Sequence, residues 1–128
     1  MLFRIFLEET GPHRLIAEDL GEVAPYVRPA LQSLEIPGFK IPFWESDHNG
    51  GLVPGSDYQR LSLATFATHD HPTIRQYWEG WNSDANGNGL REMRAVMAFC
   101  GRSDIALPQG FSPEIHEAFL RGLFASNS

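Results

Sequence analysis

Short apolar runs that end in acidic or polar residues alternate with helical segments along this chain, and this alternation constrains the fold most. The first run covers residues 15–17 and is followed at once by Glu18 and Asp19, and two further runs cover residues 39–44 and 61–67. Such runs are typical of buried strands in a parallel sheet. Strands that alternate with helices predict parallel pairing through right-handed crossovers, so we expect an α/β fold with about three parallel strands.

The segments between these runs have helical spacing of their apolar residues. Gly11-Pro12 ends the first segment and Pro37-Gly38 ends the second, in which Pro29 is compatible with a helix only in the first turn. Pro72 is expected to be the first helical residue of the third segment, and Ser112-Pro113 is expected to begin the last. The expected helices are residues 2–9, 25–34, 72–81, 90–100 and 112–123.

Composition excludes several classes of protein. The 128 residues carry a net charge of −6 without a basic run, which disfavours a nucleic-acid binder because such proteins need clustered Lys and Arg. No apolar stretch approaches the roughly 20 residues of a membrane helix, and Arg4 interrupts the apolar start, so we expect neither a membrane partner nor a signal sequence. Cys100 is the single cysteine and is expected to be a small buried hydrophobe. A cytoplasmic protein is expected.

The first and third runs place carboxylates at the same expected edge of the sheet. Glu18 follows the first run and Asp70 follows the third, and the carboxyl ends of parallel strands meet where active sites form. Two carboxylates there suit glycosidic chemistry, in which one is a protonated acid and the other stays ionised. A structural role is the alternative. Asp70 lies near a helix start that it could cap, and Glu18 and Asp19 could interact favourably with the positive end of the next helix's dipole.

Residues 68–71, Thr-His-Asp-His, also raise the question of a metal site, but adjacent residues point in different directions and we do not expect one. His71 is expected to be a cap or a residue of the rim. Trp44 follows the second run at the expected rim, where it could stack on a sugar or pack. Trp78 and Trp81 fit a helical apolar stripe and are expected to pack in the core.

Several motifs in the same order resemble one known family. Residues 16–21, Ile-Ala-Glu-Asp-Leu-Gly, resemble the IAEDLG signature of 4-alpha-glucanotransferases (amylomaltase or disproportionating enzyme, glycoside hydrolase family 77). The other matching segments are Val27-Arg28, residues 36–40 (IPGFK), residues 68–70 (THD), Trp78-Glu79 and residues 123–128.

The resemblance implies a role for each matching residue. Glu18 would be the general acid/base, and Asp70 would hold the donor sugar and stabilise the transition state. His69 would donate a hydrogen bond to the same sugar, and Asp19 would support the site from behind. The partners would be alpha-1,4-glucans or maltooligosaccharides, and no cofactor is implied.

The resemblance also implies a part of a larger site. The family's nucleophile is an aspartate on an earlier strand, and no strand before Leu15 supplies it here. A (β/α)8 barrel has about 250 residues, so we expect residues 1–128 to form a single partial domain, the C-terminal slice of a glucanotransferase barrel. We expect this polypeptide to be inactive alone and to self-associate through exposed sheet edges. The alternative is a non-catalytic remnant that binds glucan or oligomerises.

Overall fold

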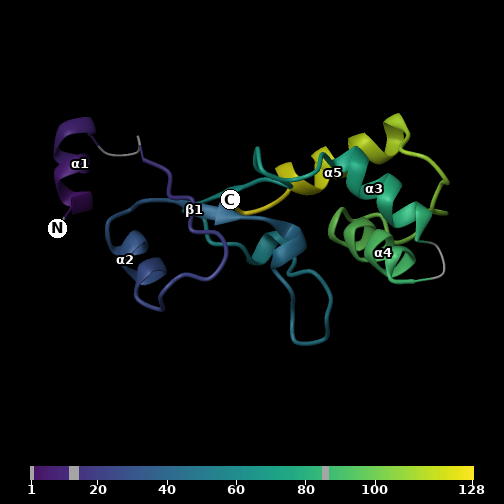
Figure 1. Cartoon of the computed structure of the whole chain (residues 1–128), viewed down its shortest axis with the longest axis horizontal. Coiled ribbons are helices and arrows are strands. Elements are labelled where there is room, and N and C mark those ends of the chain that lie inside the picture. The colour runs from purple at the N-terminus through teal and green to yellow at the C-terminus, as the bar shows by residue number, and fades with distance from the viewer. Residues whose placement is uncertain (1, 12–14, 85–86) are drawn as a thin grey trace.

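The computed structural model describes residues 2–11, 15–84 and 87–128. The α-helices are α1 (Leu2–Thr10), α2 (Val27–Ser33), α3 (Ile74–Ser83), α4 (Gly89–Phe99) and α5 (Pro113–Phe124). The strands are β1 (Gly38–Lys40) and β2 (Ser62–Ala64), and two short 3-10 helices are η1 (Pro42–Trp44) and η2 (Gly55–Asp57). Figure 1 shows α1 at one end of the molecule, α3, α4 and α5 gathered at the other, and the sheet between them.

The sheet is small and parallel. β1 pairs with β2 in the register Gly38 to Ser62 and Lys40 to Ala64. On its other side, β1 forms a parallel bridge to Ala17, whose N–H donates to the Pro37 carbonyl at 2.8 Å. The sheet therefore runs in the order Ala17, β1, β2, which confirms parallel pairing and a mixed α/β fold.

The expected strand lengths are wrong. The run at 15–17 forms a single bridge, the run at 39–44 is a strand only to Lys40, and the run at 61–67 is a strand only over Ser62–Ala64. Next to the Ala17 bridge, the Phe39 N–H donates to the side chain of Asp19 at 2.8 Å, and no further backbone pairing follows on this side of β1 among the described residues. On β1 itself, Pro42 starts η1 and has no N–H with which to extend a ladder.

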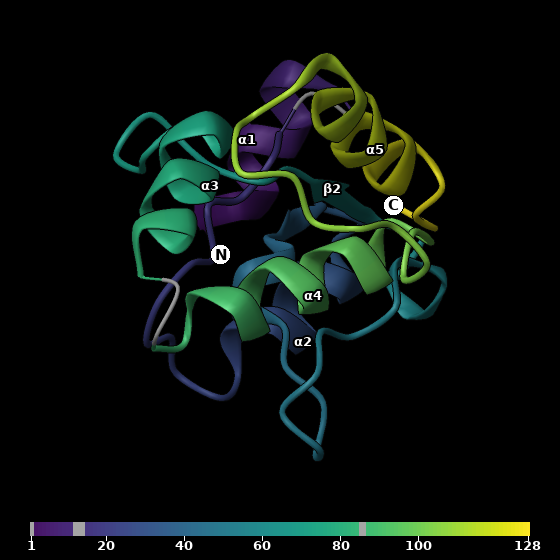
Figure 2. The same cartoon turned by 90° about the vertical axis from the view of Figure 1, so that its right-hand side faces the viewer.

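The main core lies between the three C-terminal helices, which Figure 2 shows on the side facing the viewer. Trp78 of α3 is fully buried, and its ring lies 6.2 Å from that of Phe119 of α5. Trp81 packs against this core, which confirms the expected packing of both tryptophans. Cys100 is also buried there, as expected. The buried members are Phe66, Trp78, Met93, Val96, Met97, Cys100, Ile115, Ala118 and Phe119.

The start of α2 differs from the expectation. The helix begins at Val27 rather than Pro25, so Pro29 falls in its first turn, where its missing N–H is tolerated. It ends before Pro37 in a Schellman motif, in which the Ile36 N–H donates to the Leu31 carbonyl at 2.9 Å. Glu35 supplies the left-handed residue of this motif, with φ of 56°.

The start of α3 was also wrongly predicted. Pro72 lies outside the helix, and Thr73 is the N-cap, with its hydroxyl accepting from the Gln76 N–H and the Gln76 side chain accepting in return. The expected start of α5 is confirmed, because the Ser112 side chain accepts from the Ile115 N–H. Gly11 follows α1 with φ of 81°, and Pro12, the other half of that predicted stop, lies outside the described residues.

Candidate functional site

Three loops follow the carboxyl ends of the paired segments and carry most of the candidate residues. Glu18 and Asp19 follow Ala17, η1 with Trp44 follows β1, and residues 68–71 follow β2. Because the three segments are parallel, their carboxyl ends lie along one edge of the sheet. β1 stands between the first and third loops, so the strand axes that lead to Glu18 and Asp70 are about 10 Å apart.

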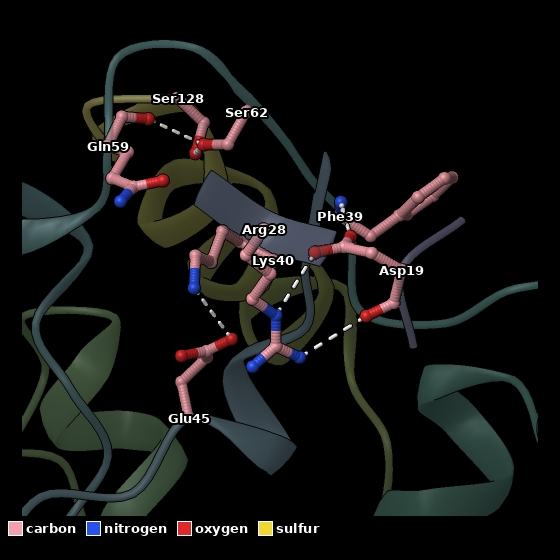
Figure 3. Close-up of polar contacts among 8 residues, drawn as sticks. All are labelled: Asp19, Arg28, Phe39, Lys40, Glu45, Gln59, Ser62 and Ser128. Carbon is pink, nitrogen blue, oxygen red and sulfur yellow. Dashed lines mark hydrogen bonds and ion pairs between the residues drawn. The ribbon is translucent and has the colours of Figure 1, made fainter. Parts of the chain in front are cut away.

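Asp19 is the most constrained of these residues, and Figure 3 shows its contacts. Its side chain is only 8% exposed, and its Oδ1 accepts the Phe39 N–H at 2.8 Å. Its Oδ2 lies 3.2 Å from Nε of Arg28, and Nη2 of Arg28 donates to the Asp19 carbonyl at 3.2 Å. One guanidinium therefore contacts both the side chain and the backbone of Asp19, which joins this loop to α2 and β1.

Gly38 is required by this arrangement. A Cβ at Gly38 would lie 2.5 Å from Oδ1 of Asp19, well inside van der Waals contact. The glycine of the IPGFK segment thus leaves room for the buried carboxylate beside the central strand. These contacts join the Asp19 loop to α2 and β1, while the supporting role that the family resemblance implies for Asp19 stays a prediction.

Glu18 precedes Asp19 directly and its side chain is exposed. Its backbone is linked to the Asp19 contacts on one side and to the Ala17 bridge on the other. The position of its backbone is therefore fixed by the sheet, while its carboxylate faces solvent.

Residues 68–71 form a tight turn. The His71 N–H donates to the Thr68 carbonyl at 3.2 Å, and Oγ1 of Thr68 lies 2.7 Å from Nδ1 of His71. His69 and Asp70 stand at the tip, 79% and 73% exposed, with Nε2 of His69 3.2 Å from Oδ1 of Asp70. Because Thr73 caps α3, the capping role considered for Asp70 is wrong. Among the described residues, no group of three or more His, Cys, Asp or Glu is arranged to hold a metal ion.

Trp44 lies at the end of η1 with 46% of its surface exposed. Its ring meets that of His71 edge-on, with centroids 4.7 Å apart and planes at 66°. The structure therefore brings Trp44 to the turn that carries His69 and Asp70, which come from the next segment of the sheet. Beside it, Glu45 pairs with Lys40 of β1 at 3.0 Å.

Two features of this region were not found from the sequence. Arg28 was noted only as part of a motif, although it is the cation that pairs with Asp19 nine positions earlier. The Thr68–His71 contact was also missed, although hydroxyl and imidazole groups three positions apart in a turn are a recognisable signal.

Burial raises the pKa of the Tyr58 hydroxyl above its ordinary value, and the negative charge of Glu45 raises it further. Tyr58 is 3% exposed and therefore stays a neutral phenol. Burial also raises the pKa of the Cys100 thiol to about 12, so neither group is suited to act as a nucleophile at neutral pH.

The family model described as 4-alpha-glucanotransferase, glycoside hydrolase family 77, matches residues 1–128. The chain therefore belongs to the 4-alpha-glucanotransferase family, as the sequence motifs predicted. A 4-alpha-glucanotransferase of Chlamydia muridarum is 39% identical over 66 residues, which is 50% of this chain and 12% of that protein. The chloroplastic/amyloplastic 4-alpha-glucanotransferase of Solanum tuberosum is 32% identical over 97 residues, 74% of this chain and 17% of its own length.

A 4-alpha-glucanotransferase of Chlamydia pneumoniae is 40% identical over 65 residues, which is 12% of that protein. The matched segment thus spans less than one fifth of the length of each of these three relatives. In the described part of the chain, no helix has both the length and the apolar character needed to cross a membrane.

Proposed function

We propose that this segment supplies the general acid/base and part of the donor-sugar contacts of a retaining 4-alpha-glucanotransferase. Membership of the family supports the reaction class. The observation that carries the assignment is the strand order, because Glu18 and Asp70 follow parallel segments on either side of β1. A separation of about 10 Å between those segments leaves room for a sugar ring between the two carboxylates.

In this proposal, Glu18 protonates the departing glycosidic oxygen while a nucleophilic carboxylate attacks the anomeric carbon. Glu18, now a base, then removes a proton from a hydroxyl of the acceptor glucan, and the glycosyl group is transferred with retention. Asp70 and His69 contact hydroxyls of the donor sugar, and Trp44 offers an apolar face to its ring. Asp19 holds the backbone next to Glu18 through Phe39 and Arg28.

We further propose that the segment is part of a (β/α)8 barrel. The parallel order Ala17, β1, β2 supports this, and so does the return of the chain to β2 after α5. There the Ser128 hydroxyl lies 2.7 Å from that of Ser62, the first residue of β2 (Figure 3). Residues 1–17 contain no aspartate, so a polypeptide of these 128 residues lacks the family's nucleophile ahead of Glu18. Incubation with maltotriose should give no shorter or longer glucans, and disproportionation would refute this part of the proposal.

The acid role is tested in a complete enzyme. The segment of the Chlamydia muridarum protein that corresponds to this chain, chosen so that it includes the positions of Glu18 and Glu22, is replaced by residues of this chain, and Glu18→Gln is introduced. Loss of a general acid should lower transfer from maltotriose roughly 100- to 10,000-fold. Formation of the glycosyl-enzyme from an aryl maltoside should be affected less, since its leaving group needs no protonation.

Glu22→Gln is the matched control, because Glu22 is an exposed glutamate four residues further along the same loop. It should leave transfer within about twofold of the unsubstituted graft, as expected for a surface substitution away from the site. A Glu18→Gln graft that transfers glucan normally would remove Glu18 from the acid role.

A second candidate, a non-catalytic glucan-binding or oligomerising module, is favoured by apolar side chains that lie on the surface. Ile16 beside the sheet is 54% exposed, Leu63 of β2 is 38% exposed and Phe124 of α5 is 83% exposed. Exposed apolar groups near an open sheet edge favour self-association of the isolated polypeptide. Light scattering that shows a clean monomer would contradict this self-association.

We also propose a cytoplasmic location, which Cys100, a free and buried thiol, supports.

A further inference from the structure

Trp44 has an exposed ring on a very short element. η1 is three residues long, and its cap lacks a side-chain hydrogen bond, so η1 itself does little to fix the orientation of the indole. The ring contact that orients it on the side of the next loop is an edge-on contact with His71, at a centroid distance of 4.7 Å. Edge-to-face contacts of this kind are favourable beyond the area that they bury.

His71 is itself held in place by the turn that contains it. Oγ1 of Thr68 meets Nδ1 of His71 at 2.7 Å, which fixes the plane of the imidazole ring. The His71 N–H bond to the Thr68 carbonyl closes the backbone of the turn, and Pro72 restricts the backbone of His71 further. The imidazole is therefore a rigid support and not a freely rotating side chain.

The same turn carries polar groups that suit a sugar. Asp70 precedes His71, so their Cα atoms are about 3.8 Å apart, and the Asp70 carboxylate is exposed at the tip beside His69. An indole face and a carboxylate held at a fixed separation match a glucose unit, which has an apolar C–H face and a rim of hydroxyl groups. A glucose unit can contact both groups at once only if Trp44 and the turn keep this separation.

We infer that His71 is a positioning residue, which Thr68 orients and which holds the Trp44 ring where one glucose unit of an α-glucan contacts Trp44 and Asp70 together. The inference rests on the proposed function and extends it, because it assigns the spacing of the aromatic and polar contacts to a side chain that touches neither the reacting atoms nor the sugar.

The test uses the 128-residue chain labelled with 5-fluorotryptophan, in which each of the three tryptophans gives one fluorine NMR signal. Trp44→Phe identifies the Trp44 signal. Maltoheptaose should shift this signal in the unsubstituted chain and leave those of the buried Trp78 and the core-packed Trp81 in place. The concentration dependence of the shift gives the dissociation constant.

Two variants remove the support in different ways. His71→Ala removes the ring that contacts Trp44, and Thr68→Val removes only the hydroxyl that orients that ring. Each should move the Trp44 signal before sugar is added and raise the dissociation constant roughly 3- to 10-fold, because the ring must then be ordered on binding. His71→Phe, which keeps an aromatic ring at this position, should bind within about twofold of the unsubstituted chain, unlike His71→Ala. His48→Ala, in an exposed loop, is the control and should change neither quantity.

The outcomes separate the two proposals. Unchanged affinity in His71→Ala and Thr68→Val, together with weaker binding in Asp70→Asn, overturns the positioning role and leaves the sugar contacts standing. A Trp44 signal that maltoheptaose does not move overturns the inference as a whole. The acid role of Glu18 is decided independently by the Glu18→Gln graft.

Discussion

The contact between Gly38 and Asp19 permits a quantitative prediction about the framework of the site. In Gly38→Ala, the new methyl would lie 2.5 Å from Oδ1 and 2.8 Å from Cγ of Asp19. Ordinary contacts are about 3.5 Å, so the carboxylate must withdraw by about 1 Å. The hydrogen bond from the Phe39 N–H, now 2.8 Å, would then exceed bonding distance.

Loss of a hydrogen bond to a charged acceptor costs about 1.5–3 kcal/mol. The Arg28 ion pair adds at most about 1 kcal/mol, because the Arg28 side chain is 54% exposed. We therefore expect Gly38→Ala to lower the free energy of unfolding by about 2–3 kcal/mol, measured by urea denaturation followed by circular dichroism.

A double-mutant cycle tests the cause. In the background of Asp19→Ala the atoms that the methyl would strike are absent, so Gly38→Ala should be neutral or stabilising by up to about 1 kcal/mol, as alanine is preferred to glycine within a strand. In the background of Asp19→Asn the atoms remain, and the cost should persist. An equal cost of Gly38→Ala in the presence and absence of the Asp19 side chain would refute this reasoning.

Two further predictions concern stability. Glu35 has φ of 56° at the left-handed position after α2, so Glu35→Gly should raise the free energy of unfolding by about 0.5–1 kcal/mol in urea denaturation. The control Glu79→Gly, inside α3, should lower it by about 1 kcal/mol, and a lower free energy of unfolding in Glu35→Gly would contradict the strain argument. Burial raises the pKa of Cys100 from 9.0 to about 12, so its contribution is complete below pH 9.0 and is lost as the pH rises toward 12. The free energy of unfolding should therefore fall by about 1 kcal/mol one pH unit above 9.0, and by less in Cys100→Ala; an identical fall in both proteins would exclude the thiol as the cause.

The order of the elements could be predicted from the sequence because it depends on local patterns. Helical spacing of apolar residues identified all five α-helices to within a few residues, and Ser112-Pro113 marked the start of α5 correctly. Strands between helices predicted parallel pairing, and both the β1–β2 pair and the Ala17 bridge are parallel. The burial of Trp78 and Cys100 followed from the same spacing.

The lengths of the strands could not be predicted, because a ladder continues only while the neighbouring backbone supplies partners. The apolar run at 15–17 gave no indication that the Asp19 side chain would take the Phe39 N–H. Similarly, the start of α3 depended on a reciprocal contact between Thr73 and Gln76, whereas Pro72 was the stronger local signal. Competition between a side chain and a backbone acceptor is decided by geometry that a one-dimensional pattern lacks.

For the candidate site, the sequence by itself determined the chemical groups and their places in the chain: two carboxylates, an imidazole and an indole after successive strand segments, in the order of the family's motifs. Only the tertiary structure decided which of them touch. It joined Asp19 to Arg28 and Phe39 and set Trp44 against His71, while Glu18 and Asp70 stayed exposed on separate loops. The reason is that a contact such as that between Asp19 and Phe39, 20 residues apart, depends on the position of β1 between its neighbours, which the packing of the whole chain fixes.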